Sequence, residues 1–467
     1  MHIKIGLETH IQLNSKSKLF CGCRNPANLE EDPDPNTLTC PTCLGLPGSK
    51  PRTNRKVVEM GIRLALALNS RIAGKTYFSR KTYFYPDMSK NFQITQYEVP
   101  LASGGFLQTG IKKISISRIN VEEDPAKLVH VGGLGGKYVL VDYNRAGIPL
   151  LEVVTEPVFA SPAEARQYIQ KLETILEYLG IYYSYSRAVL KSDANISMEG
   201  GARVEIKNIT GSRETERALN YEIVRQKNLV SRGTAVKRET RMWNPSLGVT
   251  QEMRGKEEEE EYGYIFEPDL TAIEIGMAET EKIRKEMPEL PSQKYSRFVR
   301  QYKLPEAVAE SLTSELDIGN LFEAVSKKVE PRLAGTWIAG VLKKTLNWNN
   351  LRYARSGLKD EWITDLLKMF SEGKLTDRNT EIAIRRMAEE KRPPAEIIRK
   401  HGLEKREIGN LEDIAEKILA CNQKARSDYL SGKKEALNFL VGLAIRETNG
   451  RVEANEARKA LVKLIGK

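Results

Sequence analysis

The sequence lacks the long apolar run that a membrane-spanning helix requires. Its 467 residues are 29% charged, and these charges are spread so that no uncharged apolar stretch reaches the roughly 18 residues needed to cross a bilayer. The first residues, MHIKIGLETH, also lack the basic-then-apolar order of a secretory signal. We therefore expect neither a membrane protein nor a secreted one, and predict a cytoplasmic location.

Cysteine is also scarce, since the five cysteines are too few for a disulfide scaffold in a chain of this length. Four of them form two close pairs, Cys21-x-Cys23 and, after sixteen further residues, Cys40-Pro-Thr-Cys43. Two thiolate pairs on tight turns predict a tetrahedral, structural Zn²⁺ site without an open coordination position. Redox cysteines or a chance pairing are the alternatives. Cys421 lies in an apolar helical stretch, which predicts an inert side chain that fills space between packed residues.

Several catalytic motifs are missing. The sequence has no G-x-S-x-G, no H-E-x-x-H and no Gly-Ser-Ser run of the amidase type. With the paired cysteines assigned to metal, no activated thiol remains either. If the chain is an enzyme, it is not a self-sufficient hydrolase.

Positive charge is concentrated in the C-terminal part of the chain. The formal net charge is +11, and residues 291–467 contain 34 Lys and Arg against 25 Asp and Glu. Such an imbalance is typical of a segment that meets a polyanion. The alternative is that these side chains only keep helices soluble.

The local sequence pattern changes near residue 290. Before it, short runs of alternating apolar and polar residues predict strands, interrupted by helices near 54–69, 161–179 and 214–231. The helix at 161–179 has the clearest boundaries, because Ser161 and Glu164 form a capping box and Gly180 follows its end. After 290 the helical period replaces the strand pattern.

This change predicts an α+β fold with a large mixed-sheet domain over 1–290, carrying the zinc loop at 21–43. Pro393, Pro394 and Gly402 then divide the helical part. We predict two small all-helical domains, over 291–398 and 399–467.

Carboxylates recur on the polar faces of the predicted strands. In residues 2–13 the apolar side chains fall on odd positions, so Glu8 and His10 project together from the opposite face. The same alternation groups Asp193 with Lys191 and Asn195, and Glu205 with Lys207. Glu152 lies inside an otherwise apolar strand, where an unpaired charge would be costly, and the acidic run that includes Glu123 closes the strand before it. If these faces converge, their oxygens suit Mg²⁺. The simpler alternative, favoured by spacing alone, is that each acid lies on the solvated side of a sheet.

Nine motifs in order resemble the B subunit of the tRNA-dependent amidotransferases. They are IGLETHIQL at 5–13, CPTCLGLPG at 40–48, RKTYFYPD at 80–87, VEED at 121–124, VDYNRAGIPL at 141–150, SDANIS at 192–197, VEIKN at 204–208, FEPDL at 266–270 and DYLSGKKEALNFLVG at 428–442. The resemblance covers essentially the whole chain. It implies a cradle domain akin to glutamine synthetase and the guanido kinases, followed by a helical domain and a tail domain.

The resemblance also implies an activity and a site. Members of this family phosphorylate the side-chain carboxylate of Asp on tRNA(Asn) or Glu on tRNA(Gln) with ATP, and ammonia then displaces the phosphate. Their magnesium and nucleotide site uses residues that fall here on Glu8, His10, Glu123, Glu152, Asp193 and Glu205. Lys207 would oppose the phosphate charge. This reverses the preference for solvated acids, although His10 alone also fits an ordinary strand histidine.

The implied partners are the amidase (A) subunit, which releases ammonia from glutamine, the small (C) subunit, and misacylated tRNA. Basic residues of the tail would bind the tRNA backbone; they are Lys424, Arg426, Lys433, Lys434, Arg446 and Arg451. Some family members lack the four cysteines, so zinc would stabilise only this chain's loop. Two other functions stay open: a ligase or kinase for a free small molecule, and a zinc-containing RNA-binding module without catalysis.

Overall fold

The chain divides into two compact units, 1–291 and 292–467, which are described separately. The computed structural model describes residues 3–110, 112–132, 138–198, 201–253, 263–405, 411–448 and 452–465. The boundary between the units lies one residue from the change in pattern predicted near 290. None of the described helices is long and apolar enough to cross a membrane.

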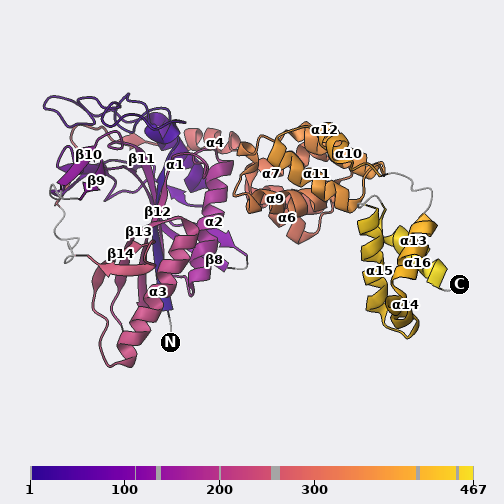
Figure 1. The fold of residues 1–467 in the computed structure, drawn as a ribbon. Coiled ribbons are helices and arrows are strands. Elements are labelled where there is room, and N and C mark those ends of the chain that lie inside the picture. The colour runs from indigo at the N-terminus through magenta and orange to yellow at the C-terminus, as the bar shows by residue number, and fades with distance from the viewer. Residues whose placement is uncertain are drawn as a thin grey trace. The chain divides into compact units, whose positions relative to one another are not determined.

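A ten-stranded sheet forms the centre of the first unit (Figure 1). Its order is β15-β14-β13-β12-β1-β11-β8-β6-β2, with β7 also paired to β8. All neighbours are antiparallel except β13 and β14, so the sheet is mixed. The strands are β1 Ile3–Gln12, β2 Arg71–Ile72, β6 Ala102–Ser103, β7 Phe106–Thr109, β8 Lys112–Glu123, β11 Pro149–Thr155, β12 Leu190–Met198, β13 Val204–Thr210, β14 Glu239–Asn244 and β15 Val249–Glu252.

Three helices cover one face of this sheet: α1 (Arg55–Ala67), α2 (Pro162–Tyr178) and α3 (Gly211–Ser231). They match the three predicted helices. At the start of α2 the Ser161 hydroxyl accepts the Glu164 N–H, as the capping box predicts. Helix α1 approaches the sheet closely at Gly61, where an added Cβ would lie 2.4 Å from a methyl carbon of Leu101. The helix-covered face is therefore the hydrophobic core of the unit, and the opposite face is left for polar side chains.

Smaller strand groups surround the central sheet. They are β3 (Lys75–Thr76) with β17 (Ile273–Glu274), β9 (Lys127–Val131) with β10 (Tyr138–Asp142), and β5 (Phe92–Thr95) with β4 (Ser79–Thr82) and β16 (Gly263–Phe266). The 3₁₀ turn η1 (Pro26–Asn28) lies in the cysteine-containing region and α4 (Met277–Lys285) ends the unit. Arg80 stabilises the group formed by β5, β4 and β16, because it donates two hydrogen bonds of 2.8 Å to the buried carboxylate of Glu267.

The described part of the second unit is helical. Its helices are α5 Pro291–Gln301, α6 Glu306–Thr313, α7 Leu316–Val325, α8 Pro331–Trp337, the π-helix η3 Ile338–Leu342, α9 Lys343–Trp348, the 3₁₀ turn η4 Tyr353–Arg355, α10 Asp360–Ser371, α11 Asp377–Glu390, α12 Pro394–His401, α13 Leu411–Cys421, α14 Gln423–Leu430, α15 Lys434–Glu447 and α16 Ala454–Ile465. The predicted class, a large mixed sheet followed by helices, is confirmed.

Buried apolar side chains of the second unit form two clusters. One runs from Phe298 to Leu403 and the other from Ala415 to Ile465. The predicted boundary between 398 and 399 falls inside α12, whose Ile397 and Ile398 belong to the first cluster. The division of the chain into three domains stays a prediction, and the structure favours a later start for the tail.

Candidate functional site

The polar face of the central sheet gathers ionisable side chains from five neighbouring strands. In the β1–β12 register Glu8 lies opposite Asp193 and His10 opposite Lys191, while on the other side of β1 His10 lies opposite Glu152 of β11. Side chains directly opposite on one face of a sheet are close neighbours. We call the resulting group, Glu8, His10, Glu122, Glu152, Asp193, Glu205 and Lys207, the polar basin.

His10 contacts two carboxylates on the β8 side of the basin. Its Nε2 lies 3.5 Å from Oε1 of Glu122 and 3.7 Å from Oε1 of Glu152. Glu152 also accepts a 2.7 Å hydrogen bond from the side-chain amide of Asn120, and Glu122 accepts one of 3.1 Å from the Thr95 hydroxyl. Because Thr95 belongs to β5, the small sheet contributes to this end of the basin.

A β-bulge shapes the opposite end. The β12–β13 register shifts between Ser192 and Ala194, and Asn208 on β13 adopts a left-handed backbone with φ of 62°. Its N–H thereby donates at 2.9 Å to Oδ1 of Asp193. Bulges of this kind are common next to active sites because they redirect side chains. Here the bulge holds Asp193 beside Glu8, which accepts a 3.0 Å hydrogen bond from Asn195.

The basic group of the basin is Lys207. Its Nζ lies 3.7 Å from Oε1 of Glu205, and the Thr240 hydroxyl donates to the other oxygen of that carboxylate. Burial lowers the pKa of Lys207, but the negative charges of Glu205, Asp193 and Glu8 outweigh burial and raise it. Lys207 is therefore a stable cation among acids.

The acids of the basin repel one another electrostatically. Burial raises the pKa of Glu8, and the negative charges of Glu152 and Asp193 raise it further. Burial likewise raises the pKa of Glu122 to about 7, with Glu152 adding to the effect and His10 opposing it. For His10, burial lowers the pKa, but Glu122 and Glu152 outweigh it, so the net shift is upward. This excess of negative charge suits a site for cations.

Of the residues predicted from the sequence, the structure brings together Glu8, His10, Glu152, Asp193, Glu205 and Lys207. Glu123 points elsewhere, because side chains alternate along β8. Its carboxylate accepts hydrogen bonds from Nζ of Lys90 and from the Ile94 N–H, at 2.5 and 2.9 Å. Its neighbour Glu122 is the β8 acid that faces His10. Whether any of these residues binds a metal or nucleotide stays a prediction.

Sequence reasoning missed Glu122 and Asn120 as members of the site. Both precede Glu123 in ISRINVEED. Ile119 and Val121 are buried, so the odd-numbered residues in this part of β8 face the core. Applying the alternation used for β1 to this run would have assigned Asn120 and Glu122 to the polar face.

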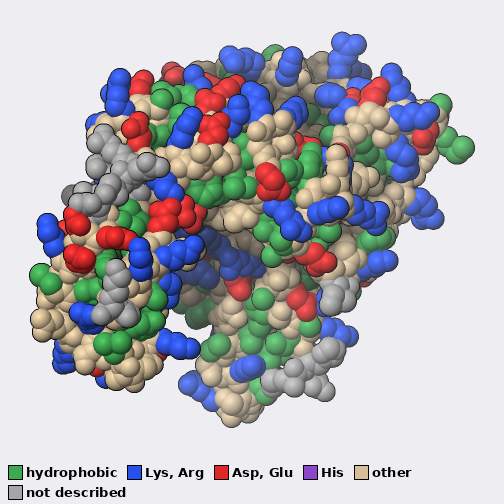
Figure 2. Space-filling model, turned by 90° about the vertical axis from the view of Figure 1, so that its right-hand side faces the viewer, with side chains coloured by type: hydrophobic (Ala, Val, Ile, Leu, Met, Phe, Trp, Pro, Cys, Tyr) green, Lys and Arg blue, Asp and Glu red, His purple; other side chains and the backbone are tan. Residues whose placement is uncertain are grey.

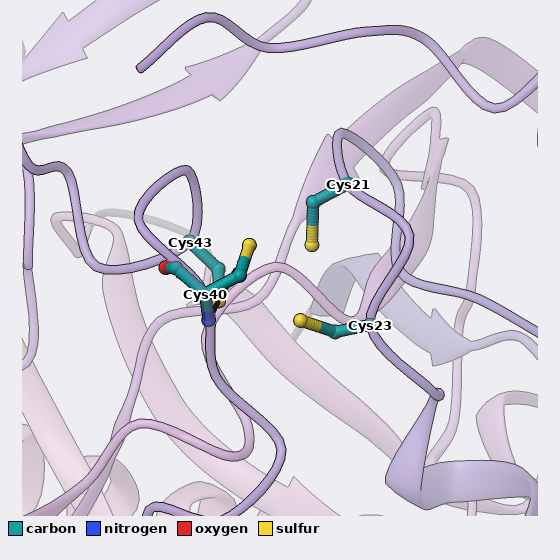
Figure 3. Close-up of side chains that lie close together, drawn as sticks. All are labelled: Cys21, Cys23, Cys40 and Cys43. Atoms are coloured by element: carbon teal, nitrogen blue, oxygen red, sulfur yellow. Dashed lines mark hydrogen bonds between the residues drawn. The ribbon is translucent and has the colours of Figure 1, made fainter. Parts of the chain in front are cut away.

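The second candidate site consists of Cys21, Cys23, Cys40 and Cys43, which we call the cysteine cluster. Their side chains converge from two loops (Figure 3), and their four Sγ atoms lie within 4.8 Å of one another. The Sγ atoms of Cys40 and Cys43 are 3.8 Å apart, which is the edge of a tetrahedron with metal–sulfur bonds of about 2.3 Å. No disulfide joins these described cysteines. Four close thiols of this kind can bind a metal ion.

Nearby groups favour negative charge on one sulfur of the cluster, that of Cys43. The thiol of Cys21 donates to Cys43, and the buried Lys18 places its Nζ 3.7 Å from the same sulfur. Together with the Cys40 N–H these contacts lower the pKa of Cys43 to about 4. A thiolate is the form that binds metals.

Comparison with known proteins agrees with this fold. Residues 3–281 match the family model described as GatB/GatE catalytic domain, and residues 320–465 match the one described as GatB domain. The chain therefore belongs to the GatB/GatE family, as its motifs predicted.

Full-length relatives carry a more particular name. Proteins named as the B subunit of aspartyl/glutamyl-tRNA(Asn/Gln) amidotransferase are similar over nearly their whole length. The one from Methanosarcina barkeri is 42% identical, covering 99% of this chain and 98% of the relative. Those from Methanococcoides burtonii and Moorella thermoacetica are 41% and 40% identical, with 98% of this chain covered and 97% and 98% of the relatives.

Proposed function

We propose that this chain is the amidating subunit of a glutamine-hydrolysing tRNA-dependent amidotransferase. It phosphorylates the side-chain carboxylate of Asp on tRNA(Asn), Glu on tRNA(Gln), or both, and then exchanges the phosphate for ammonia. The convergence of carboxylates from separate strands in the polar basin carries this proposal. The names of the full-length relatives support the substrate class.

The chemistry explains why a phosphoryl group is needed. A carboxylate is a poor acyl donor because oxide would have to leave. Attack of a carboxylate oxygen on the γ-phosphorus of ATP releases ADP and gives an acyl phosphate. Ammonia then attacks the carbonyl carbon, phosphate leaves, and the nitrogen loses a proton to give the amide. Phosphoryl transfer asks a protein mainly for positioning and charge neutralisation.

The residues of the basin suit these tasks. Glu8, Glu122, Glu152, Asp193 and Glu205 offer the hard oxygen ligands that Mg²⁺ prefers. Asn120 Oδ1, a buried oxygen next to Glu152, has no hydrogen-bond partner among the described residues, as expected for a group that completes its contacts with a bound ion or its water. When bound, Mg²⁺ supplies positive charge to the transferring phosphoryl group.

The two basic side chains of the basin, Lys207 and His10, have different roles. Lys207 holds a positive charge at one end of the basin and would draw the phosphate oxygens toward it. His10 is fixed between Glu122 and Glu152, which orients its ring and makes it a nitrogen ligand or a donor to an anionic oxygen. Glu123, held by Lys90, we place beside the basin as a supporting residue.

The cysteine cluster we assign to structural Zn²⁺, because four thiols leave no open coordination position. Ammonia must come from a glutaminase partner, since the sequence has no amidase motif of its own. We therefore propose assembly with the amidase (A) subunit and the small (C) subunit, and binding of misacylated tRNA through the cradle and the basic tail. Of the predicted tail contacts, Arg451 lies outside the described residues.

The test is reconstitution. The chain is mixed with its amidase and small partners, ATP, Mg²⁺, glutamine and misacylated tRNA, and formation of Asn-tRNA(Asn) and Gln-tRNA(Gln) is followed. Glu152→Gln should lower the amidation rate at least about 100-fold, with ammonium chloride failing to restore it, because the lost step precedes ammonia attack. The matched control is Glu274→Gln, an exposed strand carboxylate outside the basin.

The alternatives give different results. A non-catalytic RNA-binding module would show no ATP consumption with either tRNA, and Glu152→Gln would leave its RNA binding unchanged. A kinase or ligase for a free small molecule would consume ATP without misacylated tRNA. Either outcome would contradict the proposed function.

A further inference from the structure

The longest stretch of the helical unit without an acidic residue carries six positive charges. Residues 331–359 contain six Lys and Arg and no Asp or Glu. The stretch runs through α8, η3, α9 and η4. On the face drawn in Figure 2, basic and acidic side chains are intermixed. A local excess of one sign attracts a ligand of the other.

A shallow hollow of about 500 Å³ lies within this stretch. It is lined by Ser311, Ala339, Gly340, Lys343, Lys344, Asn347 and Trp348. The space beside Gly340 is open, since a Cβ there would meet nothing within 4 Å. The hollow lies at η3, and single turns of π-helix inside α-helices are frequent at functional sites.

Trp348 at the edge of this hollow has no packing role. Its side chain is 89% exposed, whereas Trp337 in the same region packs edge-on against Phe370 with ring centroids 5.0 Å apart. A tryptophan left in water gives up the free energy that its burial would provide. Proteins that bind unstacked nucleic-acid bases stack them on aromatic side chains that lie beside cations.

The two lysines of the hollow differ in their contacts. Nζ of Lys343 donates to the Ser311 carbonyl at 2.7 Å and lies 3.1 Å from Glu315, so this lysine serves the fold. Lys344 is exposed and forms no ion pair with any residue that the structure describes. Of the two lysines, Lys344 is therefore the one whose ammonium group can bind a phosphate.

We propose that this hollow binds one unstacked nucleotide of the tRNA, with the base on the Trp348 ring and the adjacent phosphate on Lys344. The proposal rests on the proposed function for the choice of tRNA as ligand. It makes the helical region an RNA contact, separate from the basic tail.

The experiment titrates the complex of this chain with its amidase and small partners against misacylated tRNA at several salt concentrations. Trp348→Ala should raise Kd about 10-fold with an unchanged salt slope, since stacking is not ionic. Trp348→Phe should restore Kd to within about 3-fold, because phenylalanine keeps an aromatic face. Lys344→Gln should weaken binding and reduce the salt slope by about 1. Lys368→Gln, an exposed lysine of α10 outside the hollow, should bind as the wild type does.

Because Trp348 is so exposed, its replacement leaves the fold intact, and unchanged melting of Trp348→Ala verifies this. Equal Kd values for wild type and Trp348→Ala, in a complex that amidates tRNA, would overturn this inference alone. A second result would also overturn it. If Trp348→Ala lost the amidase or the small partner from the complex but bound tRNA as tightly as the wild type, the hollow would be the binding site of that partner. A wild-type complex that neither binds nor amidates tRNA would overturn the proposed function and this inference with it.

Discussion

Within the polar basin, three carboxylates are each held by a hydrogen bond from an amide group. Glu152 is fixed by Asn120, Asp193 by the Asn208 N–H, and Glu8 by Asn195. These amide groups orient the carboxylates without neutralising them. The acids therefore keep the negative charge that a bound cation needs.

Glu122 is the member of the basin that the structure adds. We predict that Glu122→Gln raises the Mg²⁺ concentration needed for half-maximal amidation about 10-fold, because an uncharged amide is a weaker ligand for a hard cation. Amidation rates over a Mg²⁺ series measure this. Glu156→Gln, an exposed acid just beyond β11, is the control. An unchanged Mg²⁺ dependence would remove Glu122 from the site.

A pH effect is expected at Glu323 in the helical unit. Burial opposes ionisation, but Lys294 and Arg297 donate to this carboxylate and lower its pKa. Over the pH range in which this carboxyl titrates, the native state therefore binds fewer protons than the unfolded state. The ion pair stabilises the fold fully at pH values above the pKa of Glu323 in the unfolded chain. This stabilisation is lost as the pH falls through the pKa of Glu323 in the folded chain. We expect Glu323→Gln to lower the melting temperature by about 2–4 °C at pH 6, and by progressively less toward pH 3.

Melting curves of wild type and Glu323→Gln between pH 3 and 6 measure the difference. Glu396→Gln, which removes only an exposed pair with Arg392, is the control. A difference that stays constant with pH would contradict the assigned ion pair.

At the residue scale, the sequence predicts well which face of a strand a side chain lies on. It predicts poorly which side chains from different strands come together. The alternation in IKIGLETHIQ correctly placed Glu8 and His10 on one face, because half-buried strands obey a strict period of two. It did not show that Glu152 and Asp193 flank them. That depends on β1 lying between β11 and β12, a pairing of segments more than 130 residues apart.

Among the elements, the loops around the cysteine cluster depend most on a ligand. They contain little regular structure, and their sulfurs are drawn together without a disulfide. The loop that carries Cys40 and Cys43 also contacts the segment that carries Lys90, since the Ser89 hydroxyl donates to the Cys43 carbonyl at 2.8 Å. Metal in the cluster would thus order a segment that reaches Glu123.

We predict one bound zinc ion per chain and its loss in the double variant Cys40→Ser, Cys43→Ser. The melting temperature should fall by about 5 °C or more, since 1 kcal/mol corresponds to about 2–4 °C in a unit of this size. Elemental analysis and thermal unfolding measure the two effects. The expectation that Cys421 fills space between packed residues is wrong, because Cys421 is exposed at the end of α13. Cys421→Ser should therefore change neither. A double variant that keeps its zinc would refute the assignment.

Helices were the elements best predicted from the sequence. The capping box fixed the start of α2 to the residue, because Ser161 and Glu164 act locally. The short strands β2, β3 and β6 were not predicted. Each has two residues and exists only because a distant partner supplies its hydrogen bonds, so no local pattern indicates it.

For the whole molecule, the separate core of residues 415–465 predicts that the tail can be removed without unfolding the rest. A chain ending at Lys405 should keep its other two cores and its polar basin. We expect its KM for misacylated tRNA to rise at least about 10-fold, with a weaker dependence on salt, because phosphate contacts are lost. Amidation at varied tRNA and salt concentrations tests this. Unchanged turnover would favour a free small molecule as the substrate.

The period of strand β1 has one more consequence. Its residues face the core and the polar side of the sheet in alternation, and β1 is paired with β12 over Ile3–Ile11 and with β11 over Glu8–Gln12. Inserting or deleting a single residue inside β1 would turn Leu7 toward water and Glu8 toward the helices. Natural variation in chain length should therefore collect in the surrounding loops and spare this strand.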